Sequence, residues 1–263
     1  NFTDLDFFDR LKAKHHQFDN SNASYIIHMY EEEGTAFLTD LNGWFSGILI
    51  DLKSNKILLF NDRYGMQKVF YHETADAFYF ASEAKALLKL FPELREFDMR
   101  GLGELLSCSC VLENRSIFKN IFLLPPTSGW VFKNSIRPKK KNYFEPTEWE
   151  NQPWLENNFF YERLKETFRK ILPRYLRANS KIAVSLTGGL DTRMIMANAD
   201  LPAGKYPCYS FGSMYRDCYD VKFARKVAAI THQMHTTLPV DANFLNNFGR
   251  YADKTIYITD GYL

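Results

Sequence analysis

Hydrophobic and polar positions alternate over short stretches of the first half of the chain, as in β-strands. The predicted elements there are helices over residues 24–33 and 83–90 and strands over residues 44–52, 56–60, 69–72, 77–81 and 130–133. Short polar turns such as Ser54-Asn55 separate the strands in pairs, which predicts antiparallel hairpins. We therefore expect an antiparallel, β-rich layer with a few helices.

The pattern changes near residues 144–153, where two prolines and several polar residues indicate a linker. Beyond it, apolar strand-like stretches alternate with amphipathic helical stretches. The predicted elements are helices over residues 157–176, 192–199 and 220–230 and strands over residues 181–186, 206–211 and 233–240. This alternation predicts a parallel sheet with helices on both faces. The fold class is thus α+β followed by α/β, with domains over residues 1–150 and 151–263.

Composition excludes several classes of protein. Of the 263 residues, 46% are hydrophobic and 24% charged, which excludes a disordered or collagen-like chain. No apolar run reaches the roughly 18 residues of a membrane-spanning helix, and the N-terminal segment lacks the apolar core of a signal peptide. We expect a cytoplasmic protein without a membrane partner.

Charge and cysteine content also argue against other partners. A net charge of +2 gives no support for nucleic-acid binding. We interpret the basic run Lys139-Lys140-Lys141 as a solvated strand end. The four cysteines, among them Cys108 and Cys110, lack the repeated pairs of a zinc site or a disulfide scaffold. Reduced thiols and no nucleic-acid partner are therefore expected.

The segment most informative about chemistry is TGGLDT, from Thr187 to Thr192, which joins a predicted buried strand to a helix. Ligands bind at the carboxyl ends of such strands, and Gly188 and Gly189 let the backbone approach a phosphate. Backbone N–H groups at a helix start favour anions. Asp191 beside phosphates suggests an intervening Mg²⁺. The alternative is an ordinary turn in which Asp191 caps the helix.

This segment resembles the S-G-G-L-D-S pyrophosphate loop of the asparagine synthetase family. Further segments match that family's glutaminase domain in the same order. They are residues 41–43 (LNG), 61–65 (NDRYG, for R-D-x-x-G), 79–87 (YFASEAKAL, for F-A-S-E-x-K-A-L) and 121–129 (IFLLPPTSG, for I-x-x-L-P-P-G). The resemblance implies a partial Ntn-type αββα glutaminase domain, then the first portion of a parallel-sheet PP-loop synthetase domain, similar to adenine nucleotide alpha hydrolases.

Several departures from the family bear on function. The family's N-terminal Cys nucleophile is not matched, since this chain starts with Asn1 and its first cysteine is Cys108. The family's S-D-x-E, whose Asp grips the glutamine ammonium, is here Ser21 to Ser24 (SNAS). Asn22 is thus the candidate glutamine-binding residue, but its neutral amide brings no charge. We expect an internal portion of a longer protein with weak or lost glutaminase function.

The resemblance implies an ATP-dependent, AMP-forming amide ligase of the asparagine synthetase type. A carboxylate substrate, small molecule or peptide, forms an acyl-adenylate, and glutamine or another amine donor supplies the nitrogen. ATP and Mg²⁺ are the expected cofactors. The residues implied to bind ATP are Leu186, Thr187, Gly188, Gly189, Asp191, Thr192 and Phe211, with Asp191 also holding the metal of Mg-pyrophosphate.

Within this group, Leu186 and Phe211 are expected to flank the adenosine, and no catalytic residue is assigned. Two alternatives stay open. One is a glutamine-independent relative, such as a β-lactam synthetase or a lasso-peptide cyclase, and the other is a non-catalytic scaffold. Assembly as a homodimer is also left open.

Overall fold

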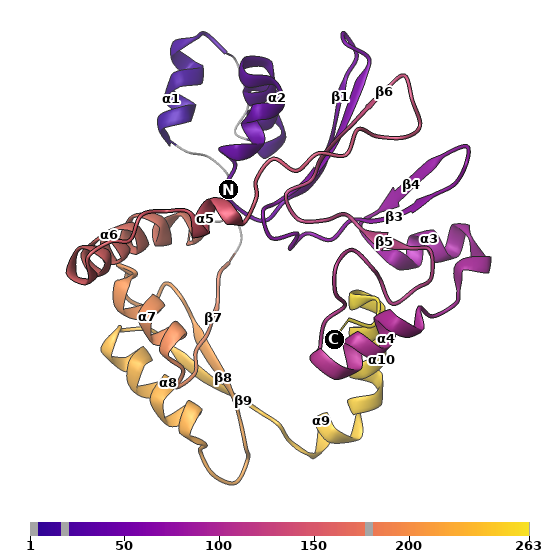
Figure 1. Cartoon of the computed structure of the whole chain (residues 1–263). Helices are drawn as coiled ribbons and strands as arrows, with labels where there is room; N and C mark the ends of the chain where they lie inside the picture. Colours follow the sequence, from indigo (N-terminus) through magenta and orange to yellow (C-terminus); the bar gives the residue numbers. More distant parts are fainter. Residues whose placement is uncertain (1–4, 17–20, 177–180, 263) are drawn as a thin grey trace. The chain divides into compact units, whose positions relative to one another are not determined.

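The computed structural model describes residues 5–16, 21–176 and 181–262, which fold as two compact units (Figure 1). The first unit contains Phe2–Gln152 and Thr255–Leu263, and the second contains Pro153 to Lys254. The chain thus passes from one unit to the other between Gln152 and Pro153. Its last residues pack with the first unit, a placement that the sequence pattern did not predict.

The first unit contains two antiparallel three-stranded sheets, ordered β1-β2-β6 and β4-β3-β5. The strands are β1 (Ser46–Asp51), β2 (Lys56–Asn61), β3 (Phe70–Glu73), β4 (Phe78–Ala81), β5 (Phe122–Leu123) and β6 (Gly129–Lys133). The helices are α1 (Leu5–Ala13), α2 (Asn22–Glu33), α3 (Ala84–Leu90), α4 (Met99–Cys108) and α5 (Thr147–Glu150), with 3₁₀ turns η1 (Gly34–Thr39) and η2 (Pro92–Leu94). The predicted hairpins are confirmed, whereas α1 and α4 were not predicted.

Three hydrophobic clusters separate four layers in this unit. The first joins Phe60 of β2 to residues of α2. The second lies between the two sheets, where Leu59 and Tyr71 meet. The third packs Phe70 of β3 against Leu87 of α3. Since neighbouring residues of one strand face opposite sides, β2 and β3 each contribute to two clusters. The resulting order of helix, sheet, sheet and helix fits the αββα layering that the family resemblance implies.

The turn between β1 and β2 is stabilised by the carboxylate of Asp51. It accepts hydrogen bonds from the hydroxyl of Ser54 at 2.6 Å, from the backbone N–H of Ser54 at 3.1 Å and from the hydroxyl of Tyr30 at 3.0 Å. These hydrogen bonds, chiefly those of Ser54, lower the pKa of Asp51 to about 2. Asn55 follows with a φ of 51°, a left-handed conformation that asparagine tolerates better than most residues. The predicted Ser54-Asn55 turn is therefore confirmed.

Two buried polar side chains at the end of β2, those of Asn61 and Asp62, form hydrogen bonds with segments that are distant in sequence. The carboxylate of Asp62 is fully buried and accepts hydrogen bonds from four backbone N–H groups, at distances of 2.9–3.2 Å. The donors belong to Phe45, Tyr64, Met66 and Gln67. Buried charges need such partners because leaving them unpaired is costly. The turn that begins at residue 61 is therefore part of the core.

Asn61, next to this carboxylate, is fully buried as well. Its amide nitrogen donates to the carbonyls of Leu124 at 3.2 Å and Pro125 at 2.9 Å, and its oxygen accepts from the N–H of Ser128 at 2.9 Å. Two segments singled out in the sequence, residues 61–65 and 121–129, therefore meet in the core. Their spacing in sequence gave no sign of this contact.

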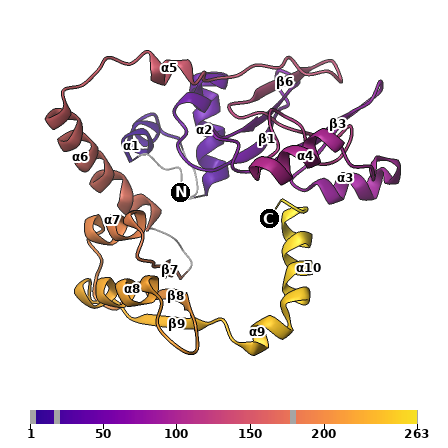
Figure 2. The ribbon, with the colours of Figure 1, turned by 60° about the horizontal axis from the view of Figure 1, so that its bottom comes forward.

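The second unit is built on a parallel three-stranded sheet in the order β7-β8-β9 (Figure 2). The strands are β7 (Val184–Ser185), β8 (Cys208–Gly212) and β9 (His235–Pro239). The helices are α6 (Asn157–Tyr175), α7 (Leu190–Asn198), α8 (Tyr219–Ile230), α9 (Ala242–Asn246) and α10 (Phe248–Thr259). The last residues of α10 belong to the first unit. The predicted alternation and parallel pairing are confirmed. β7 is shorter than the predicted strand over residues 181–186.

Helices cover this sheet differently from the prediction. Connections between parallel strands are right-handed, so the order β7-β8-β9 places α7 and α8 on one face. A buried cluster joins Leu186, Met196 of α7 and Ala224 of α8 there. On β8, Cys208 is buried but Phe211, which faces the opposite side, is 62% exposed. The expectation of a sheet covered evenly on both faces is therefore wrong for the described residues.

The long helix α6 precedes the sheet. It is amphipathic, has Pro173 in its last turns, and starts after Glu156, whose carboxylate caps the N–H groups of Asn158 and Phe159. An N-terminal acidic residue of this kind satisfies donors that lack partners in the helix. In the parts of the chain that the structure describes, neither α6 nor any other helix has both the length and the hydropathy needed to cross a bilayer.

The C-terminal residues pack on α3 and the sheet beside it. Asp260 accepts a hydrogen bond from the N–H of Ala84 at 2.7 Å, at the start of α3. Tyr262 packs against Phe70, and its hydroxyl accepts a hydrogen bond from the N–H of Ile117 at 3.2 Å. Burial raises the pKa of Tyr262. The carboxylate thus satisfies a helix N–H that residues of α3 leave unpaired.

We predict that Asp62→Asn destabilises the first unit. An amide offers only one acceptor oxygen and turns an N–H₂ group toward backbone donors, so several of the four hydrogen bonds are lost. The expected loss is about 2–4 kcal/mol in the free energy of unfolding, measured by urea denaturation. The matched control is Asp76→Asn in the exposed β3–β4 turn, for which less than about 0.5 kcal/mol is expected. Equal effects of the two changes would contradict the structural role of Asp62.

Candidate functional site

The loop between β7 and α7 contains most of the residues that the sequence singled out. Leu186, directly after β7, is fully buried in the cluster beneath the sheet. Its N–H donates to the carbonyl of Tyr209 at 2.8 Å, and its carbonyl accepts a hydrogen bond from the hydroxyl of Ser210 at 2.6 Å. The start of the loop is therefore held against β8. Only the backbone of Leu186 can face a ligand, since its side chain belongs to the core.

Threonine side chains fill the inside of the loop. The hydroxyls of Thr187 and Thr192 lie 3.4 Å apart, and the N–H of Thr187 donates to the hydroxyl of Thr192 at 3.4 Å. The N–H of Gly189 donates to the hydroxyl of Thr187 at 3.1 Å. The two hydroxyls that were expected to flank a phosphate are thus brought together across the loop, although four residues lie between them in the sequence.

The N–H of Gly188 donates to the carboxylate of Asp220 at 2.9 Å. The resemblance to a phosphate-binding loop had implied that this donor is free for an anionic ligand. Instead, an acidic side chain from the first turn of α8 lies against the loop. A carboxylate on this N–H shows that the loop attracts negative charge, which is the property required for phosphate. Asp220 begins a predicted helix 32 residues away, and its contact with Gly188 was not predicted.

The geometry at Gly188 also explains the absence of a side chain. A Cβ atom there would lie 3.0 Å from Oδ1 of Asp220 and 3.5 Å from both Tyr219 and Phe223. The constraint on Gly188 is therefore the close approach of α8. At Gly189 the φ angle is −62°, which any residue can adopt. The paired glycines thus reflect crowding rather than unusual backbone conformation.

Asp191 is the second residue of α7, and its side chain is exposed. The N-cap of this helix is Gly189, and no side chain caps it. The alternative in which Asp191 is the helix cap is therefore wrong. Its carboxylate makes no hydrogen bond or ion pair with any residue that the structure describes. An acidic group at a helix N-terminus is favoured by the helix dipole and remains available for a cation.

Phe211 and the residues around it form the neighbouring edge of the sheet. Phe211 is 62% exposed near the end of β8, so its ring is accessible. The next residue, Gly212, has no room for a side chain, since a Cβ would lie 2.7 Å from Thr237 and 2.9 Å from Val221. Close packing of α8 and β9 around Gly212 therefore sets the position of α8 against the sheet.

Polar residues that no site prediction included lie in the middle of β8 and at the start of β9. The hydroxyl of Ser210 lies 2.9 Å from Nε2 of His235, the first residue of β9. Burial and the nearby guanidinium of Arg225 lower the pKa of His235. Arg225 pairs with Asp217 at 2.6 Å and lowers the pKa of that carboxyl. Only the position of Ser210 at the end of a predicted strand offered a signal for this group.

The candidate glutamine-binding residue, Asn22, lies in the first unit. It is the first residue of α2, and its side chain is exposed. The preceding residue, Ser21, is the N-cap and accepts a hydrogen bond from the N–H of Ser24 at 3.2 Å. The helix therefore begins two residues earlier than predicted. Asn22 belongs to the first unit and the loop around Thr187 to the second.

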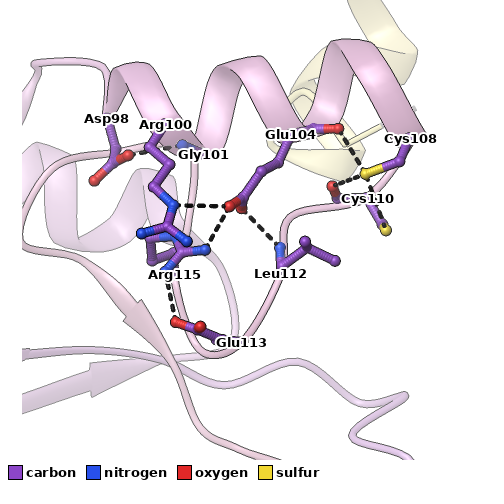
Figure 3. Close-up of polar contacts among 9 residues, drawn as sticks. All are labelled: Asp98, Arg100, Gly101, Glu104, Cys108, Cys110, Leu112, Glu113 and Arg115. Atoms are coloured by element: carbon purple, nitrogen blue, oxygen red, sulfur yellow. Dashed lines mark hydrogen bonds and ion pairs between the residues drawn. The ribbon is translucent and has the colours of Figure 1, made fainter.

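A further polar cluster surrounds Glu104 on α4 (Figure 3). The carboxylate of Glu104 accepts hydrogen bonds from the N–H of Leu112 at 3.0 Å, from Arg100 at 3.1 Å and from Arg115 at 2.5 Å. The hydrogen bond from Leu112 is the main cause that lowers the pKa of Glu104. Since each partner is a neighbouring residue of the same loop or helix, this cluster fixes the chain after α4.

The two cysteines beside this cluster are close together. The Sγ atoms of Cys108 and Cys110 lie 3.9 Å apart, and both side chains are exposed (Figure 3). Their mutual hydrogen bond raises the pKa of the Cys110 thiol. All four cysteines are free thiols, and Cys208 is the buried one. A raised pKa keeps more of the Cys110 thiol protonated and so less nucleophilic at neutral pH.

Comparisons with known proteins agree with the segments in the first half of the chain that resemble the glutaminase domain. Residues 1–144 match the family described as glutamine amidotransferase domain. The chain is 28% identical over 247 residues to asparagine synthetase [glutamine-hydrolyzing] 2 of Bacillus subtilis, covering 86% of this chain and 32% of that protein. It is 25% identical over 254 residues to a probable asparagine synthetase [glutamine-hydrolyzing] of Schizosaccharomyces pombe, covering 89% and 40%.

A third relative, asparagine synthetase [glutamine-hydrolyzing] 3 of Bacillus subtilis, is 26% identical over 228 residues, which cover 81% of this chain and 35% of that protein. The chain thus spans about a third to two-fifths of the length of these relatives. The family match covers more than half of its residues. The chain therefore belongs to the glutamine amidotransferase domain family, and residues 1–144 are an amidotransferase region of the asparagine synthetase type.

Proposed function

We propose that this chain is part of an ATP-dependent, AMP-forming amide ligase of the asparagine synthetase type. Residues 1–150 would belong to its Ntn-type glutaminase domain, and the following residues to its PP-loop synthetase domain. In this role the protein takes part in asparagine biosynthesis, or in a related amidation, in the cytoplasm. The similarity to asparagine synthetases over more than 80% of the chain supports this proposal.

The observation that carries the proposal is the loop from Thr187 to Thr192. It follows a parallel strand, opens a helix, and already has a carboxylate against the N–H of Gly188. Anions bind at such strand ends because several N–H donors and the helix dipole point the same way. For a phosphate oxygen to take this place, Asp220 would swing away from the loop. The binding site would therefore include a side chain that exchanges with the ligand.

Asp191 is suited to bind the metal ion that accompanies the phosphates. Its carboxylate is exposed and lacks a partner among the described residues, and Mg²⁺ prefers carboxylate and phosphate oxygens together. Mg²⁺ would neutralise charge on the phosphates of ATP. The hydroxyls of Thr187 and Thr192 can donate hydrogen bonds to oxygens held there. Exposed Phe211 offers a ring for the adenine, whereas Leu186 contributes only its backbone.

The proposed reaction has two forms, which differ in the source of the nitrogen. In the first, glutamine supplies ammonia. In the second, the protein is a glutamine-independent relative, as are β-lactam synthetases and lasso-peptide cyclases, and the amine comes from the substrate. Asn22 favours the second form, because its amide places no negative charge where the family's carboxylate meets the glutamine ammonium.

We predict that Asp191→Asn in the full-length protein reduces ATP–pyrophosphate exchange about 100-fold or more. The change removes the charge that would hold Mg²⁺ but keeps the shape of the side chain. The fold should survive, since the side chain is exposed and loses only a helix-dipole contribution of about 0.3–1 kcal/mol. Exchange of labelled pyrophosphate into ATP, in the presence of candidate carboxylates, is the measurement.

The matched control for that experiment is Asp200→Asn, an exposed aspartate just beyond the other end of α7. It should leave the exchange rate unchanged. Unchanged exchange in Asp191→Asn would remove Asp191 from the site. Absence of exchange in the unaltered full-length protein with any carboxylate would favour the scaffold alternative instead.

A further prediction concerns glutamine. In the full-length protein, Asn22→Asp should lower the KM for glutamine roughly 10–100-fold, because a charge-assisted hydrogen bond contributes about 1.5–3 kcal/mol. Glutamate release is the measurement. Asn157→Asp, which adds the same charge at the first residue of α6, is the control. Efficient glutamine hydrolysis by the unaltered protein would contradict the weakness assigned to Asn22.

A further inference from the structure

Two histidines and a glutamate, none of them assigned to a site above, converge between α1 and α2. Nδ1 of His16 lies 3.0 Å from Nδ1 of His28, and Nδ1 of His28 lies 2.8 Å from a carboxylate oxygen of Glu31. The distance from Nδ1 of His16 to the same oxygen is 3.8 Å. We propose that these three atoms form a binding site for a divalent transition metal of the zinc type.

The local structure brings His16 to this position. α1 ends in a left-handed turn at His15, whose φ is 65°, and the N–H of His16 donates to the carbonyl of Leu11 at 3.2 Å. The N–H of His15 donates to the carbonyl of Lys12 at 3.0 Å. This pair of hydrogen bonds is a common helix ending, the Schellman motif. It reverses the chain so that His16 meets α2, which lies beside α1 in Figure 1 and Figure 2.

The other two ligands come from one face of α2. His28 and Glu31 are three residues apart, so their side chains are neighbours on the helix surface. Both imidazoles are 17% exposed, and the Glu31 side chain is 52% exposed. The site is thus partly enclosed by protein and open on the glutamate side. A metal there would keep at least one position for water, as three-ligand zinc sites do.

The distances are compatible with metal coordination. Zinc binds nitrogen and oxygen at about 2.0–2.2 Å, which places tetrahedral ligand atoms roughly 3.3 Å apart. The three observed separations of 2.8, 3.0 and 3.8 Å lie around that value. Two imidazole nitrogens with a carboxylate form a ligand set that suits zinc, nickel or copper.

A neighbouring carboxylate supports the same assignment. Nε2 of His16 lies 2.8 Å from Glu32, and Glu32 also pairs with Lys14. At this distance the Glu32 carboxylate can accept a hydrogen bond from the Nε2–H of His16. That tautomer leaves a lone pair on Nδ1, directed at the site. Metal-binding histidines are usually oriented by such a carboxylate.

Zinc bound here would join α1 to α2. Leu11 of α1 is already 1% exposed in the cluster that includes α2. A metal would add a second connection between the two helices and so make the stability of this corner depend on zinc. The site is independent of the proposed ligase reaction, because it shares no residue with the loop around Asp191 or with Asn22.

The test is Zn²⁺ titration of the untagged, full-length protein against a chromophoric chelator, together with the visible absorption of the Co²⁺-substituted protein. We expect one Zn²⁺ per chain at this site and a raised thermal midpoint when it is bound. Glu32→Gln should weaken Zn²⁺ binding about 10–100-fold, since Glu32 positions His16 without touching the metal. His28→Gln and Glu31→Gln should weaken it further and change the Co²⁺ spectrum.

The control is His15→Asn, which removes an adjacent exposed imidazole and keeps the left-handed turn that asparagine tolerates. Its Zn²⁺ affinity should equal that of the unaltered protein. Far-UV circular dichroism identifies any variant that fails to fold, and exposed Glu31→Gln is the variant least subject to this problem. The proposal is overturned if the unaltered protein takes up no Zn²⁺, or if folded Glu31→Gln and His28→Gln bind it with unchanged affinity.

Discussion

The first unit depends on two buried polar side chains at the end of β2. Asp62 accepts hydrogen bonds from four backbone N–H groups. Asn61 donates to the carbonyls of Leu124 and Pro125 and accepts from the N–H of Ser128. A buried donor or acceptor left without a partner costs about 1–3 kcal/mol, so the segments that carry these groups must pack together in the folded unit. This pair therefore links the β1–β2 hairpin to the strand that begins at residue 129. The hydrophobic clusters on both sides of β2 are built around that link.

In the second unit, the structure around the candidate site depends on the close approach of α8 to the sheet. Gly212 leaves room for Val221, and Gly188 leaves room for Asp220. Both glycines lie at the carboxyl ends of strands or just beyond, where ligands of parallel sheets bind. The same packing that stabilises α8 thus delivers a carboxylate to the loop. A phosphate and this carboxylate would compete for one N–H, which makes the position of α8 part of the binding site.

The hydrophobic pattern predicted most elements because each pattern is local. The strands of the first unit and the helices of the second lie close to their predicted ranges, since alternation and helical spacing report which face of an element is buried. Among the elements missed is α4, of which only Gly101 is buried. β7 is shorter than predicted because it pairs with β8 through two residues only.

The sequence pattern was enough to predict the antiparallel hairpins, the alternation of strands and helices from residue 157 to residue 240, the change in pattern near residue 150 and the position of the TGGLDT loop between a strand and a helix. It also determined the family, through short segments that can be recognised one at a time. Only the tertiary structure decided that Asp220 meets Gly188, that Asp191 does not cap its helix, and that His16 meets His28. The physical reason is that periodicity records which face of one element is buried, whereas these contacts depend on how separate elements pack against one another.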